Sequence, residues 1–144
     1  MWLFKGKEIT TPPEDYTGFI YKITLPDKSF YIGKKAFTHK KKTKLSKKAK
    51  LLPENKGKRV SITQKDSGWL SYYGSSIPLK NHLKTLSKKD FANVKREILC
   101  FCKTKQDLSY REMENLVLEN VLFKDNCWNG NILSRFFKGK INEI

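Results

Sequence analysis

Two short runs of β-forming residues lie close together near the start of the chain. Gly18–Thr24 has the sequence GFIYKIT, and Tyr31–Lys34 has the sequence YIGK. The residues between the two runs, Pro26 to Ser29, are of the types that form tight turns. This pattern predicts a β-hairpin over about residues 16–35.

A helical segment is predicted in the middle of the chain. Pro78 suits the first turn of a helix, and the preceding Ser75 or Ser76 could cap it. The apolar residues that follow at helical spacing are Leu79, Leu83 and Leu86.

A third strand and a long helix are predicted further along. The strand is Val94 to Cys102, and its alternation places five residues on one face: Val94, Arg96, Ile98, Cys100 and Cys102. The helix is Gln106 to Phe123, with Asp107 or Ser109 as start signals. Three strands covered by helices make a small α/β fold, with a three-stranded antiparallel sheet built from the hairpin and the third strand. We expect an N-terminal extension at 1–15, one domain at 16–135 with a basic insertion at about 34–60, and a C-terminal tail at 136–144.

One acidic residue of the long helix falls among its apolar positions. At 100° per residue, Glu114 lies in the same sector as the apolar residues, whereas Glu112 and Glu119 lie with Asn115 on the polar side. A carboxylate on a buried face is costly unless it is paired or bound to a cation. Glu114 therefore either meets a lysine at the edge of the core or holds a metal ion, for which Mg²⁺ is suited. The apolar residues that define the sector are Met113, Leu116, Val117, Leu118 and Val121.

The chain is strongly basic, with a net charge of +16 over 144 residues. Residues 34–59 carry twelve Lys and Arg against the single acid Glu54. This charge predicts nucleic acid as the partner rather than a membrane surface. No signal peptide or transmembrane segment is visible, so we expect a soluble, cytoplasmic protein. The lysines predicted to contact DNA phosphates are Lys34, Lys40, Lys41, Lys42, Lys44, Lys47 and Lys48.

The three cysteines do not suggest a disulfide framework. Cys100, Cys102 and Cys127 are odd in number and lack framework spacing, so we expect them to pack as small hydrophobic residues. A zinc site that combines them with His39 or His82 is the alternative, and their spacing is unlike that of a tetrahedral cluster.

The hairpin sequences GFIY and YIG resemble the signature of the GIY-YIG nuclease superfamily. The family has a glutamate on its long helix and an asparagine after that helix, and Glu114 and Asn129 match these positions. The resemblance covers about residues 16–132 and is to the phage-encoded homing endonucleases of T-even-like phages. The segments that carry it are YIGKK, GWLSYYGSS, KREIL and CWNGN.

The resemblance implies an endonuclease that hydrolyses DNA phosphodiester bonds with one Mg²⁺ or Mn²⁺ ion per site. It implies Glu114 as the metal ligand, with the hydroxyls of Tyr21 and Tyr31 orienting or deprotonating the attacking water. Gly33 would let the backbone pass close to this cluster, and Asn129 would position a phosphate or a tyrosine. One site per chain leaves open whether the protein nicks DNA or cuts both strands as a dimer.

One family feature is missing from this chain. The family places an arginine on the helix after YIG, and none stands at residues 36–42. Lys35, Lys41 or Arg59 could substitute, although lysine lacks the bidentate fork of arginine. His39 could act as a base or a hydrogen-bond donor.

Three alternatives stay open. A non-catalytic nucleic-acid-binding protein would explain the charge and the missing arginine, and an RNA-directed nuclease would explain the same residues. Trp69, Tyr72 and Tyr73 could stack on bases, although we expect at least Trp69 to pack in the core.

Overall fold

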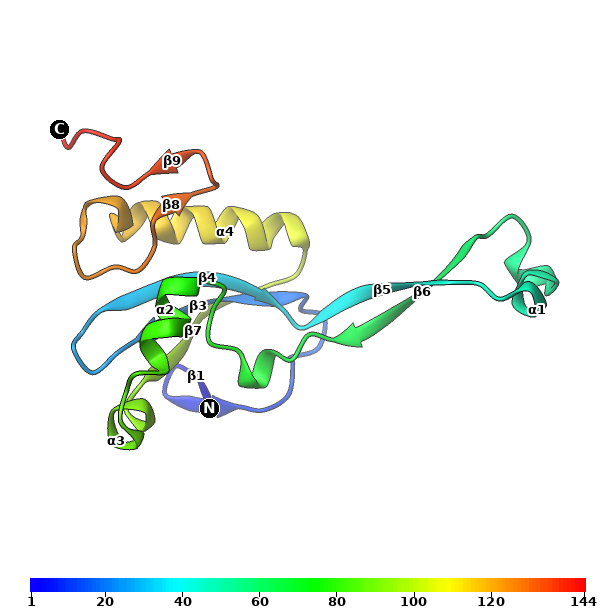
Figure 1. The fold of residues 1–144 in the computed structure, drawn as a ribbon, viewed down its shortest axis with the longest axis horizontal. Coiled ribbons are helices and arrows are strands. Elements are labelled where there is room, and N and C mark those ends of the chain that lie inside the picture. Colours follow the sequence, from blue (N-terminus) through cyan, green and yellow to red (C-terminus); the bar gives the residue numbers. More distant parts are fainter.

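The computed structural model describes all 144 residues, which form a layered α/β body and a long arm that projects from it (Figure 1). The main sheet has the strand order β2-β1-β7-β3-β4. The predicted α/β class is confirmed, but the sheet has five strands rather than three. The strands are β1 (Trp2–Phe4), β2 (Lys7–Ile9), β3 (Gly18–Thr24), β4 (Phe30–Ala36) and β7 (Lys95–Cys102).

The two unpredicted strands come from residues 1–15, which were expected to be an extension. β1 pairs with β2 and also runs parallel to β7, where Leu3 lies opposite Glu97. Trp2 anchors this segment, because its side chain is fully buried and its Nε1 donates a 2.7 Å hydrogen bond to the Trp69 carbonyl. Strands of three residues give almost no periodic signal, so the sequence pattern could not reveal them.

The predicted hairpin is confirmed as β3 and β4, which pair antiparallel. The chain reverses between Leu25 and Ser29, whose backbones are hydrogen-bonded, and Lys28 adopts a positive φ of 72° in this turn. The register places Tyr21 opposite Gly33 and Ile23 opposite Tyr31. β4 has no neighbour on its other side in the sheet, so it forms an edge.

Helices cover both faces of the main sheet (Figure 1). On one face lies α4 (Lys105–Leu118), and on the other lie the short helices α2 (Ile77–Leu83) and α3 (Lys88–Ala92). Two hydrophobic clusters result, one on each face, and they contain Trp2 and Tyr21 on one side and Ile20 and Leu116 on the other. Burial on both faces explains why the β3 sequence is apolar almost throughout.

Strand β7 was predicted at nearly its observed bounds, but its side chains do not share one face. Its register with β3 shifts between Ile20 and Tyr21, so Leu99 is an extra residue in the strand. A bulge of this kind moves the following side chains to the opposite face. Ile98 therefore packs in the cluster with Trp2, whereas Cys102 packs in the cluster with Leu116.

The helix ends follow ordinary capping chemistry. Ser76, one of the two predicted caps, accepts a hydrogen bond from Leu79 N at the start of α2. The long helix starts earlier than predicted, because the Thr104 hydroxyl accepts from Asp107 N. It also ends earlier: Asn120 has a φ of 50°, and the 3₁₀ turn η3 (Val121–Phe123) follows. A small hairpin, β8 (Asn131–Ile132) and β9 (Phe136–Phe137), continues the chain.

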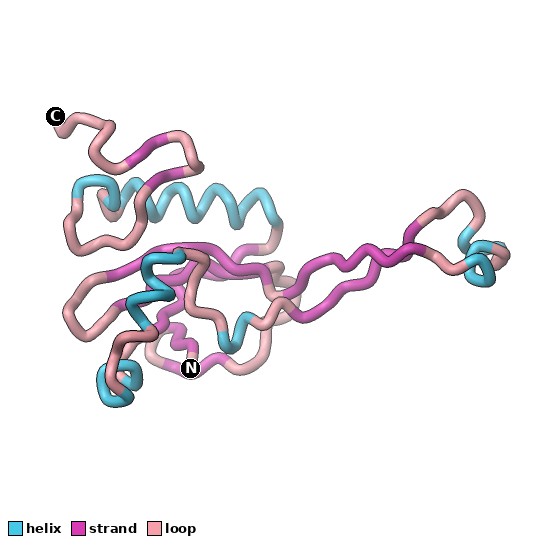
Figure 2. Tube along the Cα trace, in the orientation of Figure 1, coloured by secondary structure: helices cyan, strands magenta, loops and turns pink.

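The predicted basic insertion is an ordered arm (Figure 2). β5 (Thr38–Lys44) pairs antiparallel with β6 (Val60–Asp66) along the full length of both strands. The tip carries the short helices α1 (Lys47–Lys50) and η1 (Pro53–Asn55). None of the arm's helix or strand residues is buried. After the arm, the turn η2 (Trp69–Ser71) returns the chain to the core.

The remaining expectations from composition can be compared directly with the structure. Cys102 and Cys127 are buried in the cluster with Leu116, and Cys100 packs against it, as expected for small hydrophobic residues. No group of three His, Cys, Asp or Glu side chains is placed to hold a metal ion. No helix combines the length and the apolar character needed to cross a bilayer.

Candidate active site

A polar cavity of about 590 Å³ lies beside the edge strand β4. Four parts of the chain meet there: β4, the segment that enters α2, the middle of α4 and the loop after residue 127. The polar residues on its wall include Tyr31, Lys34, Ser75, Ser76, Glu112 and Asn129.

The two signature tyrosines lie on the same face of the hairpin, with ring centroids 6.2 Å apart. Tyr31 lines the cavity, and its hydroxyl lies 3.1 Å from Ser75 Oγ. Tyr21 is almost fully buried, and its ring packs edge-on against Tyr72. Burial raises the pKa of both phenols above the ordinary value, and the neighbouring tyrosines raise that of Tyr21 further. Both side chains are therefore neutral phenols at physiological pH in the free protein.

Gly33 is required by the position of Tyr21. A Cβ on Gly33 would collide with the Tyr21 hydroxyl and lie 2.7 Å from its Cζ atom. Gly74 plays a similar part against Tyr31, because it has a φ of 90° and an added Cβ would lie 3.2 Å from Tyr31 Cε1. Two glycines thus let the backbone pass directly over the tyrosine pair.

The acid on the cavity wall is Glu112, and Glu114 does not lie on the buried face of the helix, where it was expected. Glu112 lies between Leu108 and Leu116 at spacings of four, and both leucines are buried. Glu114 is two residues further along, which at 100° per residue places its side chain about 200° around the helix axis from Glu112, nearly on the opposite side. Its oxygens lie 2.9 Å and 3.0 Å from a nitrogen of Arg111 in a surface ion pair.

The error came from the residues used to define the apolar face. Val117 and Leu118 are exposed, at 57% and 74% of their full accessible areas. Val121 is buried, but it follows the end of the helix and so does not share its periodicity. Leu108 shows the correct face, and counting it with Leu116 would have pointed to Glu112.

The Glu112 carboxyl has a raised pKa because it is largely shielded from solvent. The positive charge of Lys34 and the Lys34 backbone amide oppose this effect. Lys34 itself extends along α4, where its Nζ donates a 3.0 Å hydrogen bond to Ser109 Oγ. A carboxyl with a perturbed pKa and a lysine beside it, on the wall of a polar cavity, is a typical functional arrangement.

Asn129 lies on the cavity wall, but its amide is used by the edge strand. Its Oδ1 accepts from Ile32 N at 2.9 Å, and its Nδ2 donates to Ile32 O at 2.8 Å. The Cys127 thiol also donates to Oδ1. The amide therefore replaces a missing strand neighbour and fixes β4 between Tyr31 and Gly33, instead of extending toward a ligand.

The other predicted basic residues are not brought into this cavity. Lys35 points to the opposite side of β4 from Lys34, where its Nζ lies 4.1 Å from the centre of the Tyr72 ring and burial lowers its pKa. His39 and Lys41 lie on β5, and Arg59 directly precedes β6, so all three belong to the arm. Lys34, predicted only as a DNA contact, is the single basic residue on the cavity wall.

Arg96 supports the tyrosine pair indirectly, through the segment that carries Tyr72. This role was not predicted from the sequence. Its guanidinium donates to the carbonyls of Leu70 and Tyr72, at 3.0 Å and 2.9 Å, and lies against the Trp2 ring. These bonds hold the segment whose Tyr72 ring contacts Tyr21. The expectation that Trp69 packs in the core is confirmed, because only 1% of it is exposed.

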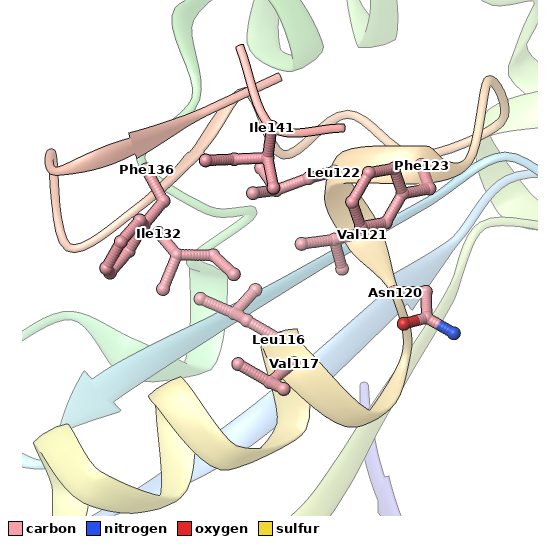
Figure 3. Close-up of a pocket in the computed structure, with 9 residues that line it drawn as sticks. All are labelled: Leu116, Val117, Asn120, Val121, Leu122, Phe123, Ile132, Phe136 and Ile141. Atoms are coloured by element: carbon pink, nitrogen blue, oxygen red, sulfur yellow. The ribbon is translucent and has the colours of Figure 1, made fainter. Parts of the chain in front are cut away.

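A second hollow, of about 320 Å³, lies at the end of α4 (Figure 3). Asn120 is its only polar residue, and its other lining side chains are aliphatic or aromatic (Figure 3). It contains no titratable group, so the polar cavity beside β4 is the candidate site for chemistry in this protein.

Comparison with known protein families gives one match, and it covers residues 2–137. The matching family model is described as "Putative endonuclease segE, GIY-YIG domain". Neither the comparison with curated proteins nor the comparison with solved structures gives a match. The family match includes β1 and β2, and it confirms the resemblance drawn from the hairpin sequences.

Proposed function

Because the chain belongs to the GIY-YIG endonuclease domains of the SegE type, we propose that it is a Mg²⁺-dependent enzyme that hydrolyses DNA phosphodiester bonds in the cavity beside β4. The observation that carries this proposal is the meeting of Glu112, Lys34 and Tyr31 on one polar wall. The signature residues of the hairpin and the acid of α4 are far apart in sequence and meet on this one wall.

Glu112 is the residue we assign to the metal ion. A single carboxylate in a polar cavity suits Mg²⁺, which keeps several waters and takes its other ligands from substrate phosphates. The absence of a larger acidic cluster agrees with this kind of site and not with a cage made only of protein ligands. When bound, a divalent cation supplies charge stabilisation to the phosphate and lowers the pKa of water.

The two tyrosines position the reacting groups through hydrogen bonds. Since burial raises the pKa of both phenols, each keeps its proton and can donate to a phosphate oxygen or orient a water molecule. Tyr31 does this directly, because its hydroxyl is on the cavity wall beside Ser75. Tyr21 acts from beneath Gly33 and holds the Tyr31 ring in place.

Lys34 takes the place of the missing arginine. Its ammonium group lies on the cavity wall near Glu112, where it can neutralise charge that develops on the phosphate. Lysine acts as a point charge, so we expect it to stabilise the phosphate without fixing its orientation. Asn129 contributes as a positioning residue, through the backbone of β4.

The proposal is tested by cleavage of supercoiled plasmid DNA with Mg²⁺ and with EDTA. Glu112→Gln keeps the shape of the side chain and removes its charge, and we expect at least a hundredfold loss of cleavage rate, the order of effect seen when a key electrostatic group is removed. Glu114→Gln is the matched control on the same helix, and we expect it to cut like the wild type. If Glu114→Gln is the inactive variant, the assignment to Glu112 is wrong.

Two further outcomes decide between classes of function. A wild-type protein that binds the plasmid but does not cut it with Mg²⁺ or Mn²⁺ would identify a non-catalytic binding protein. Faster digestion of single-stranded or duplex RNA than of DNA would identify an RNA-directed nuclease. A role in homing requires, in addition, that cleavage is restricted to few sites on long DNA.

A further inference from the structure

The arm concentrates most of the charge of the molecule in a small part of the chain. Residues 38–66 contain eleven Lys and Arg and two acids, whereas the other 115 residues contain nineteen and twelve. The arm therefore carries nine of the sixteen net positive charges. None of the three ion pairs in the structure lies in it.

The side chains of the arm take no part in the hydrophobic core of the protein. Every residue of β5 is exposed, and neither α1 nor η1 has a buried residue. Both hydrophobic clusters are built without any residue of 38–66. Two-stranded ribbons with no packed face are only marginally stable in water, and self-repulsion of the lysines lowers the stability further.

The dimensions of the arm match a groove of duplex DNA. Two paired strands with their side chains are about 10 Å wide, which fits the major groove of B-DNA at about 12 Å. Seven residues per strand extend roughly 24 Å, or roughly seven base pairs. Figure 1 shows the ribbon extending away from the body, and only its base lines a hollow with body residues such as Asp15 and Tyr16.

We propose that the β5–β6 arm enters the major groove of duplex DNA and presents the face formed by Lys40, Lys42, Ile62 and Gln64 to the base edges. This proposal rests on the proposed function, because it names the element that holds and selects the DNA which the cavity beside β4 cuts.

The register of the ribbon defines its two faces. Gln64 lies opposite Lys40 and Ile62 lies opposite Lys42, so these four residues share one face. An amide such as Gln64 can pair with adenine, a lysine with guanine, and an apolar side chain with the thymine methyl group. Ile62 is 56% exposed, so its side chain is free to contact a thymine methyl group.

The opposite face has the chemistry of phosphate contacts. It presents the ammonium groups of Lys41 and Lys65 and the hydroxyl of Thr63. Such groups contact phosphates, which fixes the orientation of the protein on DNA without selecting a sequence. The lysines of the tip extend the contact along the phosphate backbone. Duplex RNA is disfavoured as the partner, because its A-form major groove is deep and too narrow for side chains to enter.

The first experiment measures affinity for a DNA duplex of about 30 base pairs by fluorescence anisotropy, over a range of salt concentrations. Lys41, Lys47 and Lys48, which belong to the phosphate-contacting face and the tip, are changed together to Gln, and the matched control changes Lys84, Lys88 and Lys89, three exposed lysines of the body, to Gln. We expect the arm variant to bind the duplex at least about tenfold more weakly. The slope of its log affinity against log salt concentration should become shallower by about 0.9 for each lost phosphate contact. An equal loss in the body variant would overturn the proposal.

The second experiment asks which groove is used. The duplex is prepared with glucosylated 5-hydroxymethylcytosine, whose sugar occupies the major groove, and the minor-groove ligand netropsin is added to unmodified duplex in parallel. The sugar should weaken binding about tenfold and netropsin should have little effect. The reverse result would place the arm in the minor groove and contradict the proposal. An RNA duplex of the same sequence that binds as tightly as DNA would contradict it too.

A variant without the arm shows whether these effects belong to it. Ser67 N donates to Phe37 O at 3.0 Å, so residues 38–66 can be replaced by Asn-Gly, a two-residue hairpin turn. The glucosyl group should not change the affinity of this variant. If the glucosyl group still weakens DNA binding by the variant without the arm, the major-groove contact belongs to the body instead.

The third experiment tests the face of the ribbon. The ends produced by cleavage of long DNA are sequenced for Ile62→Ala/Gln64→Ala and for the control Ser61→Ala/Thr63→Ala, which changes the other face of the same strand. We expect the first pair alone to broaden the set of cleaved sequences. Failure of the proposed function can be told apart from failure of this inference. If the wild-type protein binds DNA but does not cut it, the proposed function fails, but the affinity and groove experiments can still test the arm.

Discussion

The body and the arm of this protein fold for different reasons. The body buries two hydrophobic clusters against the faces of a five-stranded sheet. The arm has only a backbone ladder between β5 and β6, with no buried side chain in either strand. Core packing therefore specifies the body, whereas the arm is specified by turn and strand chemistry.

We propose that this difference separates two tasks that share one chain. Chemistry at the cavity beside β4 requires side chains fixed within fractions of an ångström, which the packed body provides through Gly33, Asn129 and Arg96. Contact with DNA requires charge and reach, which an exposed ribbon provides with few packing constraints. We expect substitutions in the body to change stability and catalysis, and substitutions in the arm to change binding.

The largest contrast is expected from removing one apolar side chain in each region. Trp2→Ala deletes a fully buried ring and its hydrogen bond to Trp69, and should lower the free energy of unfolding by about 3–5 kcal/mol. Ile62→Ala in the arm should change it by less than about 0.5 kcal/mol. Urea denaturation followed by tryptophan fluorescence measures both. Equal losses would show that the arm packs as part of the core.

The next contrast concerns two glycines beside the cavity. Gly33→Ala would place a methyl group against Tyr21, and overpacking of this kind typically costs about 1–3 kcal/mol. It should also reduce plasmid cleavage at least tenfold, because the tyrosine pair must move. Gly130→Ala is the control, since an added Cβ there meets no atom within 4 Å. Cleavage by Gly33→Ala at the wild-type rate would argue against a role for the tyrosine pair.

The hairpin, the third strand and the general fold class could be predicted from the sequence because their signals are local. Turn residues at 26–29 and alternating runs on either side depend on no distant contact. The strands β1 and β2 could not be found in this way. Each has three residues, and β1 is held mainly by pairing with β7 and by the burial of Trp2.

The candidate site shows the same limit at the level of single residues. Tyr21, Tyr31, Gly33 and Asn129 were predicted from their sequence motifs, and the structure brings them together. Glu112, which we propose as the metal ligand, was not predicted, because the helix end at Leu118 and the burial of Leu108 depend on tertiary packing. An error of two positions on a helix moves a side chain to nearly the opposite face.

A smaller effect, about tenfold in rate, is expected from limited proteolysis with trypsin. The exposed lysines of the marginally stable arm should be cut before those of the body, and bound duplex DNA should slow these cuts about tenfold without protecting the exposed loops of the body. Mass spectrometry of the early fragments identifies the sites. Early cleavage in the body, with the arm intact, would reverse the assignment of the two regions.

The smallest expected effect is on the pH dependence of stability. Burial raises the pKa of Glu112 in the folded protein, so folding is favoured when this carboxyl is protonated. That contribution is fully present below the ordinary pKa of a glutamate and is lost as the pH rises through the raised value.

Glutamine stays neutral at every pH, so Glu112→Gln does not lose stability as the pH rises through the pKa of Glu112. The variant should therefore be more stable than the wild type at neutral pH, and the difference should shrink as the solution is acidified. Glu114→Gln instead loses an exposed ion pair with Arg111, which contributes little to stability, and should be at most slightly less stable than the wild type at neutral pH. Thermal unfolding at several pH values measures both variants. A Glu112→Gln protein less stable than the wild type at neutral pH would mean that the charge of Lys34 outweighs burial, so that folding lowers the pKa of Glu112 instead of raising it.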